Sequence, residues 1–229
     1  MILCIETATS HCSAALGWGE ELLASRSVSA PEGGHAAALA PMVEELLGQL
    51  KAEGKQLRAI AVSAGPGSYT GLRISTSLAK GLCLGMQLPL IAVDTLAILT
   101  AGARRLRPET QATLHPMLDA RRMEVYTATF DAAGRRLSED NALVLEAEQS
   151  LATEGEHLFF GDGALKVKGL WPEGHYELLE ELLYPEAKDM VALATQLYEA
   201  ETFVDTAYWT PNYLKEYVAV VAKNKVLQR

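Results

Sequence analysis

The spacing of apolar residues divides the first hundred positions into short strands and amphipathic helices. Apolar residues recur at intervals of three and four between Leu39 and Leu50, with polar residues on the opposite side, which is typical of a helix that buries one face. Short apolar or β-prone runs separated by turn residues predict strands. The elements expected in this half are strands at 2–8, 12–17, 21–29, 59–64 and 89–93 and helices at 39–50, 70–86 and 95–106. Their order is βββαβαβα.

The second half repeats much of this order. The elements expected there are strands at 114–120, 124–131, 136–145 and 157–161, a short helix near 146–152, a weaker helix and strand, and a last helix at 189–198. Two copies of one βββαβαβα unit predict a duplicated α/β fold with two mixed sheets flanked by helices. The apolar pattern breaks near 104–108, so we expect an N-terminal domain at 1–104 and a smaller C-terminal domain at 105–229, whose final helix could pack back on the first domain.

Composition and charge exclude several classes of protein. The chain carries 20 basic and 29 acidic residues, a formal net charge of −9, whereas a protein that binds nucleic acid unaided normally presents a basic surface. Its three cysteines show no CxxC spacing, which argues against a disulfide framework or a zinc ribbon. No basic region precedes the apolar N-terminus, and Gln87, Pro89 and Asp94 interrupt the apolar stretch 82–103. We therefore expect a cytoplasmic protein without a signal peptide or a membrane span.

The segment GPGSYTGLR, residues 65–73, joins a predicted strand to a predicted helix. A glycine-rich loop in this position can direct backbone N–H groups at a phosphate. The spacing nevertheless fits neither the Walker A motif nor the dinucleotide fingerprint, and Ser68 lacks the flanking glycines of an esterase nucleophile. The simpler interpretation is that the glycines permit a tight turn and a closely packed helix.

The helix predicted at 70–86 carries small residues among larger apolar ones. Ser77, Gly81 and Gly85 recur at four-residue intervals, which forms a seam narrow enough for the backbone of a second helix. Spacing alone leaves open whether the neighbour is the chain's own sheet or another subunit. The candidate interface comprises this seam and four positions expected to face outward, and its residues are Tyr69, Arg73, Thr76, Ser77, Lys80, Gly81 and Gly85.

Two acidic residues lie at the ends of corresponding strands of the two halves. Glu6 and Asp119 could in principle hold magnesium or activate water in a cleft between the copies. The loops beside them, 7–13 and 120–123, contain no glycine, so they offer few backbone donors to a phosphate. The five histidines form no zinc motif and are expected to be surface or capping residues. We therefore assign no catalytic, cofactor-binding or metal-binding residue.

Four segments of the sequence form a recognisable combination. They are IETAT at 5–9, GPGSYTGLRI at 65–74, LIAVDTL at 90–96 and MLDARRMEVYTATFD at 117–131. Together they resemble the bacterial TsaB family, also called YeaZ, and the likeness covers nearly the whole chain. Glu6 stands where Asp is commoner in that family. The resemblance implies membership of the actin, hexokinase and Hsp70 superfamily, which agrees with the element order expected from the pattern.

The resemblance also implies a function. TsaB proteins act in making N6-threonylcarbamoyladenosine on tRNA next to the anticodon, as partners of the paralogous transferase TsaD and together with the ATPase TsaE. Thr95 and Leu99 match the two histidines of the paralogue's metal-binding VNHxEGH segment, and neither ligates a metal as imidazole does. The expectation is a non-catalytic scaffold without a cofactor that forms a heterodimer with TsaD through helices 70–86 and 39–50. It would contact tRNA only through the complex, and homodimerisation of the isolated chain stays open.

Two alternatives belong to other classes. The first is an ATP-dependent phosphotransferase of the actin-like superfamily that uses Glu6 and Asp119, and nucleotide turnover by the isolated chain would reveal it. The second is an M22-like peptidase, against which the absence of paired histidines argues.

Overall fold

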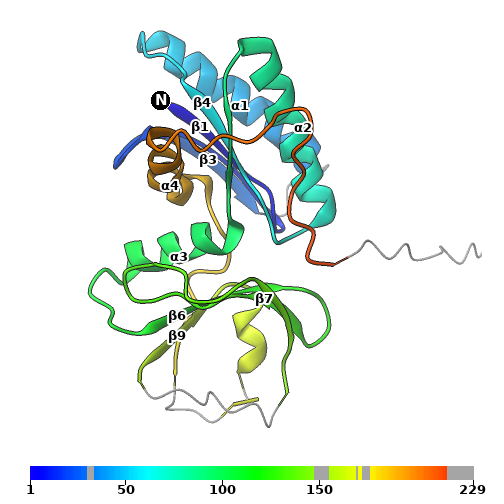
Figure 1. Cartoon of the computed structure of the whole chain (residues 1–229), viewed down its shortest axis with the longest axis vertical. Coiled ribbons are helices and arrows are strands. Elements are labelled where there is room, and N and C mark those ends of the chain that lie inside the picture. The colour runs from blue at the N-terminus through cyan, green and yellow to red at the C-terminus, as the bar shows by residue number, and fades with distance from the viewer. Residues whose placement is uncertain (30–33, 147–154, 169, 172–175, 216–229) are drawn as a thin grey trace, which may run out of the picture.

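The computed structural model describes residues 1–29, 34–146, 155–168, 170–171 and 176–215, and Figure 1 shows its elements in two stacked halves. The first half is built on a five-stranded sheet. Its strands are β1 (Ile2–Glu6), β2 (His11–Trp18), β3 (Glu21–Ser29), β4 (Ala59–Ser63) and β5 (Leu90–Val93). Their order is β3-β2-β1-β4-β5, in which β1, β2 and β3 pair antiparallel and β1, β4 and β5 pair parallel.

The second half repeats this layout. Its strands are β6 (Thr113–Asp119), β7 (Glu124–Thr127), β8 (Asn141–Val144), β9 (His157–Phe160) and β10 (Glu177–Leu179), in the order β10-β9-β6-β7-β8. Both sheets place their first strand in the centre, with an antiparallel pair on one side and a parallel pair on the other. The predicted duplicated α/β fold, with two mixed sheets flanked by helices, is therefore confirmed.

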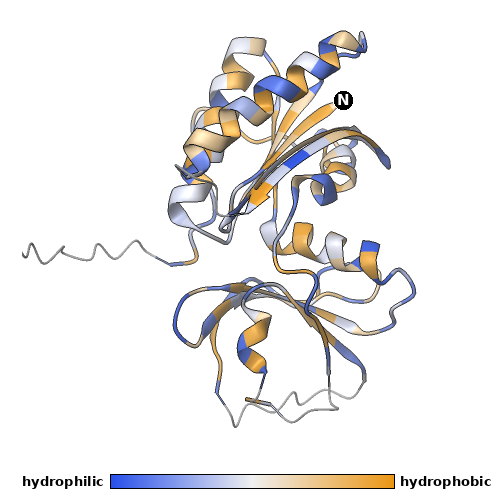
Figure 2. Cartoon of the chain, turned by 180° about the vertical axis from the view of Figure 1, so that it is seen from behind, coloured by the Kyte–Doolittle hydropathy of each residue, from blue (hydrophilic) through white to orange (hydrophobic). Residues whose placement is uncertain are grey.

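The helices separate the sheets into layers. α1 (His35–Ala52) and α2 (Tyr69–Met86) cover one face of the first sheet and enclose an apolar core that includes Leu3, Leu46 and Ile60. The central strands β1 and β4 are buried along their whole length, as expected for strands covered on both faces, and Figure 2 shows the strands next to the N-terminus as hydrophobic. The short 3₁₀ helix η1 (Ala164–Val167) lies on the outer face of the second sheet.

Two helices lie between the sheets, and each packs on the sheet that it does not follow in the chain. α3 (Thr95–Leu106) follows the first sheet in the chain, yet Leu96, Leu99 and Ala103 pack on the second sheet. α4 (Ala187–Glu199) follows the second sheet, yet it packs on the first sheet through Met190 and its neighbours. Figure 1 shows this arrangement, with α3 above the lower sheet and α4 among the upper elements.

Several expected elements differ from the structure. β7 ends at Thr127 instead of 131, and α1 begins at His35 instead of 39. The strand expected at 136–145 begins only at Asn141. The Arg136 backbone instead forms an isolated antiparallel bridge with Phe130, and its side chain forms ion pairs with Asp94 and Asp140 at 2.6 Å each. The helix expected near 146–152 falls mostly on residues 147–154, which lie outside the described residues. Among the described residues, no helix combines the length and the hydropathy that crossing a membrane requires.

Candidate functional site

The glycine-rich loop at 65–73 packs directly against the end of β1. A methyl group on Gly71 would collide with the carbonyl oxygen of Thr7, and the Thr7 hydroxyl donates to the Gly71 carbonyl oxygen at 2.8 Å. Ser68 donates its backbone N–H to the Ala8 carbonyl oxygen at 2.6 Å, and its side chain caps α2 by accepting from Gly71 N at 3.2 Å. These N–H groups are therefore engaged within the protein, which supports the packing interpretation of the motif over phosphate binding.

The outer face of α2 presents small and apolar side chains. Ser77, Gly81 and Gly85 are all exposed, and a Cβ added at either glycine would meet no described atom within 4 Å. Leu84 is 81% exposed in the same stretch of the helix. Sequence reasoning missed Leu84, although its position between the two glycines of the seam was a usable signal. We call Ser77, Gly81, Leu84 and Gly85 the α2 stripe.

Thr76 corrects one sequence prediction, since it does not face outward. Only 7% of it is exposed, and its hydroxyl has no described partner. Thr76 belongs to the inner face of α2 with Leu72, Ala79 and Cys83, because residues three and four apart on a helix share a side.

Tyr69 and Arg73 form a cluster at the start of α2. The Arg73 guanidinium donates to the Tyr69 hydroxyl at 3.1 Å and lies 5.3 Å from the centre of the Tyr69 ring. The Tyr213 ring lies 4.7 Å from the Tyr69 ring, which ties the C-terminal segment to this end of the helix. A shallow cavity of about 480 Å³ runs from these residues along α2 to Ser77.

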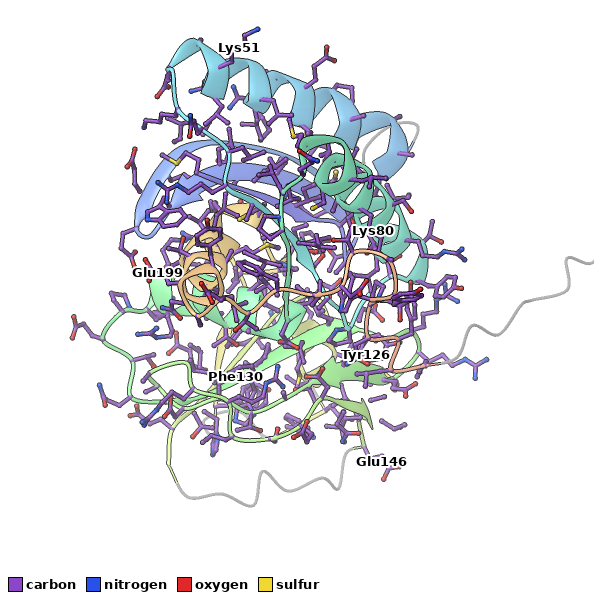
Figure 3. The ribbon with its side chains drawn as sticks, turned by 45° about the horizontal axis from the view of Figure 1, so that its top comes forward. Lys51, Lys80, Tyr126, Phe130, Glu146 and Glu199 are labelled. Atoms are coloured by element: carbon purple, nitrogen blue, oxygen red, sulfur yellow. The ribbon has the colours of Figure 1, made fainter. Side chains whose placement is uncertain are left out.

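Lys80 is half-buried and already engaged by the C-terminal segment. Its Nζ donates to the carbonyl oxygens of Trp209 at 2.7 Å and Ala207 at 3.3 Å, and Figure 3 shows Lys80 beside that segment. Tyr208, between these two carbonyls, is 86% exposed. No pattern in the sequence indicates this contact, which joins positions about 130 residues apart.

The two acidic strand ends have unlike environments. Glu6 is fully buried, its Oε1 accepts from Ala8 N at 2.5 Å, and its Oε2 has no described partner. Burial raises the pKa of Glu6 to about 8. Asp119 is exposed and forms an ion pair with Lys166 at 2.7 Å. Burial raises the pKa of Asp119, but hydrogen bonds from Lys166 and from Arg121 N outweigh it, so the pKa lies below its usual value.

These residues do not fit a metal. A buried carboxyl that is neutral at pH 7 is a poor ligand for a cation, and Thr95 and Leu99 are fully buried. The Thr95 hydroxyl accepts from Gly65 N at 3.1 Å, so it anchors the start of the glycine-rich loop at 65–73. Within the described part of the chain, no three His, Cys, Asp or Glu side chains form a group that could hold a metal.

The sequence predicts that the histidines lie at the surface or cap helices. Among the described residues this prediction is wrong for His11 and His157, and His175 lies outside the described residues. His11 is 8% exposed and His157 is 3% exposed. The parallel pairing of β6 and β9 brings His115 to His157, whose nearest ring nitrogens lie 3.0 Å apart. The separation of 42 positions along the chain kept this pair from being recognised in the sequence.

Comparison with known proteins places these features in a family. The family model described as TsaD, tRNA N6-adenosine threonylcarbamoyltransferase, matches residues 27–223. The chain is 34% identical over 225 residues to the tRNA threonylcarbamoyladenosine biosynthesis protein TsaB of Escherichia coli, a match that covers 95% of this chain and 96% of that protein. The chain belongs to the TsaB family. It is thus related to TsaD, as the resemblance of the GPGSYTG and DARRMEVY segments implied.

Further relatives agree with this membership. TsaB of Bacillus subtilis is 30% identical over 182 residues, which cover 80% of this chain and 76% of that protein. The solved structure of YeaZ from Pseudomonas aeruginosa superposes with a TM-score of 0.77 at 28% identity and covers 93% of this chain and 98% of that one. The chain is therefore a TsaB-family protein of tRNA threonylcarbamoyladenosine biosynthesis.

Proposed function

We propose that this chain is a non-catalytic partner of a TsaD transferase and binds it through the α2 stripe. The observation that carries the proposal is the exposure of Gly81 and Gly85 within a helix, next to an exposed Leu84. Glycine in a helix interior costs about 1 kcal/mol relative to alanine, and no described neighbour in this chain uses the space that these glycines leave. A second helix backbone could use it, because small residues allow helix axes to approach closely.

The Tyr69 and Arg73 cluster extends the proposed interface toward the N-terminal end of α2. Tyrosine and arginine are enriched in protein interfaces, and Arg73 is exposed beside the shallow cavity along the helix. Lys80 contributes indirectly in this proposal, since it holds the C-terminal segment against α2. Thr76 is not part of the proposed contact surface, because it is buried.

The non-catalytic role rests on residues that lack the necessary chemistry. Thr95 and Leu99 stand at the paralogue's histidine positions and are buried, and Glu6 is a buried carboxyl whose pKa is raised. We propose that the transferase supplies the metal site and that a TsaE-type ATPase completes the assembly. The net charge of −9 favours contact with tRNA only through the complex.

Co-purification of a Ser77→Trp variant with the transferase tests the interface. Ser77 is exposed, so the bulky ring should leave thermal unfolding of the free chain nearly unchanged while it abolishes binding and tRNA modification. Gln196→Trp, on an exposed position of α4, is the matched control and should retain both. Loss of stability with intact transferase binding would refute the assignment.

The same stripe is proposed to mediate self-association when the chain is alone. Ser77→Trp should then shift the isolated protein toward monomer in sedimentation experiments, and Gln196→Trp should not. Nucleotide turnover and peptide cleavage by the isolated chain are expected to be absent. Steady ATP hydrolysis that disappears in Glu6→Ala would instead support the phosphotransferase alternative.

A further inference from the structure

The outer face of the second sheet contains a cavity that is separate from α2. Leu114 and Leu118 of β6 face α3, so His115 and Met117, which alternate with them, point to the opposite face. A cavity of about 220 Å³ lies on that side, with Phe159 of β9 among its lining residues. Neither the loop at 65–73 nor the α2 stripe contributes to its lining.

Aromatic rings form one wall of this cavity. Phe159 is 1% exposed, and the His115 ring stacks on it with centroids 4.5 Å apart and planes 13° apart. The Trp171 ring meets Phe159 edge to face at 5.5 Å, and Tyr176 does so from another side at 5.6 Å. A wall of mutually packed rings keeps its shape and favours a planar guest that can stack or meet the rings edge-on.

The histidine pair gives this wall a defined polar group. His115 Nε2 lies 3.0 Å from His157 Nδ1, at hydrogen-bond distance, and His157 is 3% exposed. Burial and the neighbouring His157 lower the pKa of His115 to about 4, so its imidazole is neutral at pH 7. His115 Nδ1 has no hydrogen-bond partner among the described residues, which leaves it available to a guest.

The opposite rim offers neutral hydrogen-bonding groups. Asn141 is exposed at the start of β8, and its carboxamide bonds to no described residue. Ser138 is already used, since its hydroxyl accepts from Thr129 N at 2.8 Å. None of the described lining residues is Asp, Glu, Lys or Arg. A charged ligand would find no counterion there, whereas a carboxamide can both donate to and accept from the edge of a neutral heterocycle.

We propose that this cavity binds a free, neutral, planar heteroaromatic molecule of one or two rings, of which a purine base is an example. Phe159 and Trp171 supply the apolar wall, and His115 and Asn141 contact the polar edge of the ring. The volume sets the upper size, since pockets for larger drug-sized ligands are about 300–1,000 Å³.

Titration of the full chain with adenine, followed by amide NMR shifts and calorimetry, tests the site. Saturable shifts at residues 115, 128–129 and 141–143 are expected, with a Kd of about 0.1–1 mM for so small a ligand. Leu143→Trp fills the cavity and should weaken binding at least about tenfold. Val144→Trp is the matched control, because Val144 is the next residue on β8, is 51% exposed and points to the other face.

Asn141→Leu keeps the proposal testable even if Leu143→Trp fails to fold. Loss of the carboxamide should weaken adenine binding about threefold to tenfold, and unchanged affinity would overturn the polar-edge assignment. Absence of saturable shifts in the wild-type chain, or equal shifts in Leu143→Trp, would overturn the site itself. Binding of single-stranded oligoadenylate without binding of free adenine would overturn the assignment to a free molecule.

Discussion

The two ends of α2 use glycine for opposite reasons. Gly71 lies in the first turn, where the Thr7 carbonyl oxygen leaves no room for a side chain. Gly81 and Gly85 lie near the other end, where no described atom would meet an added methyl group within 4 Å. Packing inside the chain therefore accounts for Gly71 alone. The glycines of the α2 stripe weaken the helix, and no described packing contact in the free protein offsets that loss of stability. This contrast with Gly71 motivates the proposed external neighbour.

The largest effect is expected when the buried end is changed. Gly71→Ala should destabilise the chain by about 3 kcal/mol or more, because the methyl group can be accommodated only by moving the backbone of β1 or α2. Urea unfolding followed by circular dichroism measures this loss. A loss of stability below about 1 kcal/mol would show that the N-terminal end of α2 is loosely packed. Gly71 would then not differ from the exposed glycines of the α2 stripe.

A pH series tests the burial of Glu6, which precedes the Thr7 that Gly71 contacts. Glu6 has a pKa of about 8 in the folded chain and about 4.5 when unfolded, so the folded state holds a proton that the unfolded state releases between these values. Its contribution to stability is complete below pH 4.5 and should fall by about 1 kcal/mol per pH unit up to pH 8. Urea unfolding of Glu6→Gln should lack this component, and identical slopes for both proteins would contradict the assignment.

Substitution at the exposed C-terminal end of α2 should raise stability instead of lowering it. Gly81→Ala is expected to stabilise the free chain by up to about 1 kcal/mol, because alanine is the better helix former and the added methyl group meets open space. Gly48→Ala in α1 is the matched control, since Gly48 also has open space around it and should give a similar gain. Thermal unfolding measures both, and a loss of stability in Gly81→Ala alone would mean that the stripe packs inside the chain.

The smallest effect is expected at the second acidic strand end. Asp119→Asn removes an exposed ion pair with Lys166, and pairs of this kind contribute about 0–1 kcal/mol. Because the pKa of Asp119 is lowered, any contribution is present at neutral pH and lost as the pH falls through that pKa. Unfolding at pH 7 and pH 3 measures it, and a large loss at pH 7 would place Asp119 with Glu6 as a core residue.

Local patterns in the sequence predicted most of the elements. The helix at 95–106 has the expected bounds, and the seam of Ser77, Gly81 and Gly85 is exposed as a set. Thr76 was misplaced because it lies at the border of the buried face, where one position decides between core and surface. Helical spacing predicts which residues form the centre of a helix face, but it does not decide whether residues at the border of that face are buried or exposed.

Contacts between distant segments could not be predicted in the same way. The strand expected at 136–145 starts only at Asn141, and Arg136 before it pairs with Asp94, which belongs to the other half of the chain. The His115 and His157 pair depends on the register of β6 and β9, and a shift of one residue would point one ring to the opposite face. Residue type and spacing carry no information on such partners.

The exchange of α3 and α4 between the sheets bears on how the chain folds. The second sheet is completed by α3, which follows the first sheet in the chain, and the first sheet is completed by α4, which follows the second sheet. An ion pair at 2.6 Å between the exposed Arg105 of α3 and the buried Asp189 of α4 joins the two helices. A fragment cut near residue 108 would leave the apolar face of the first sheet without α4 and the second sheet without α3. The halves should therefore unfold together in one cooperative transition, and separately produced fragments should recover native structure only when they are mixed.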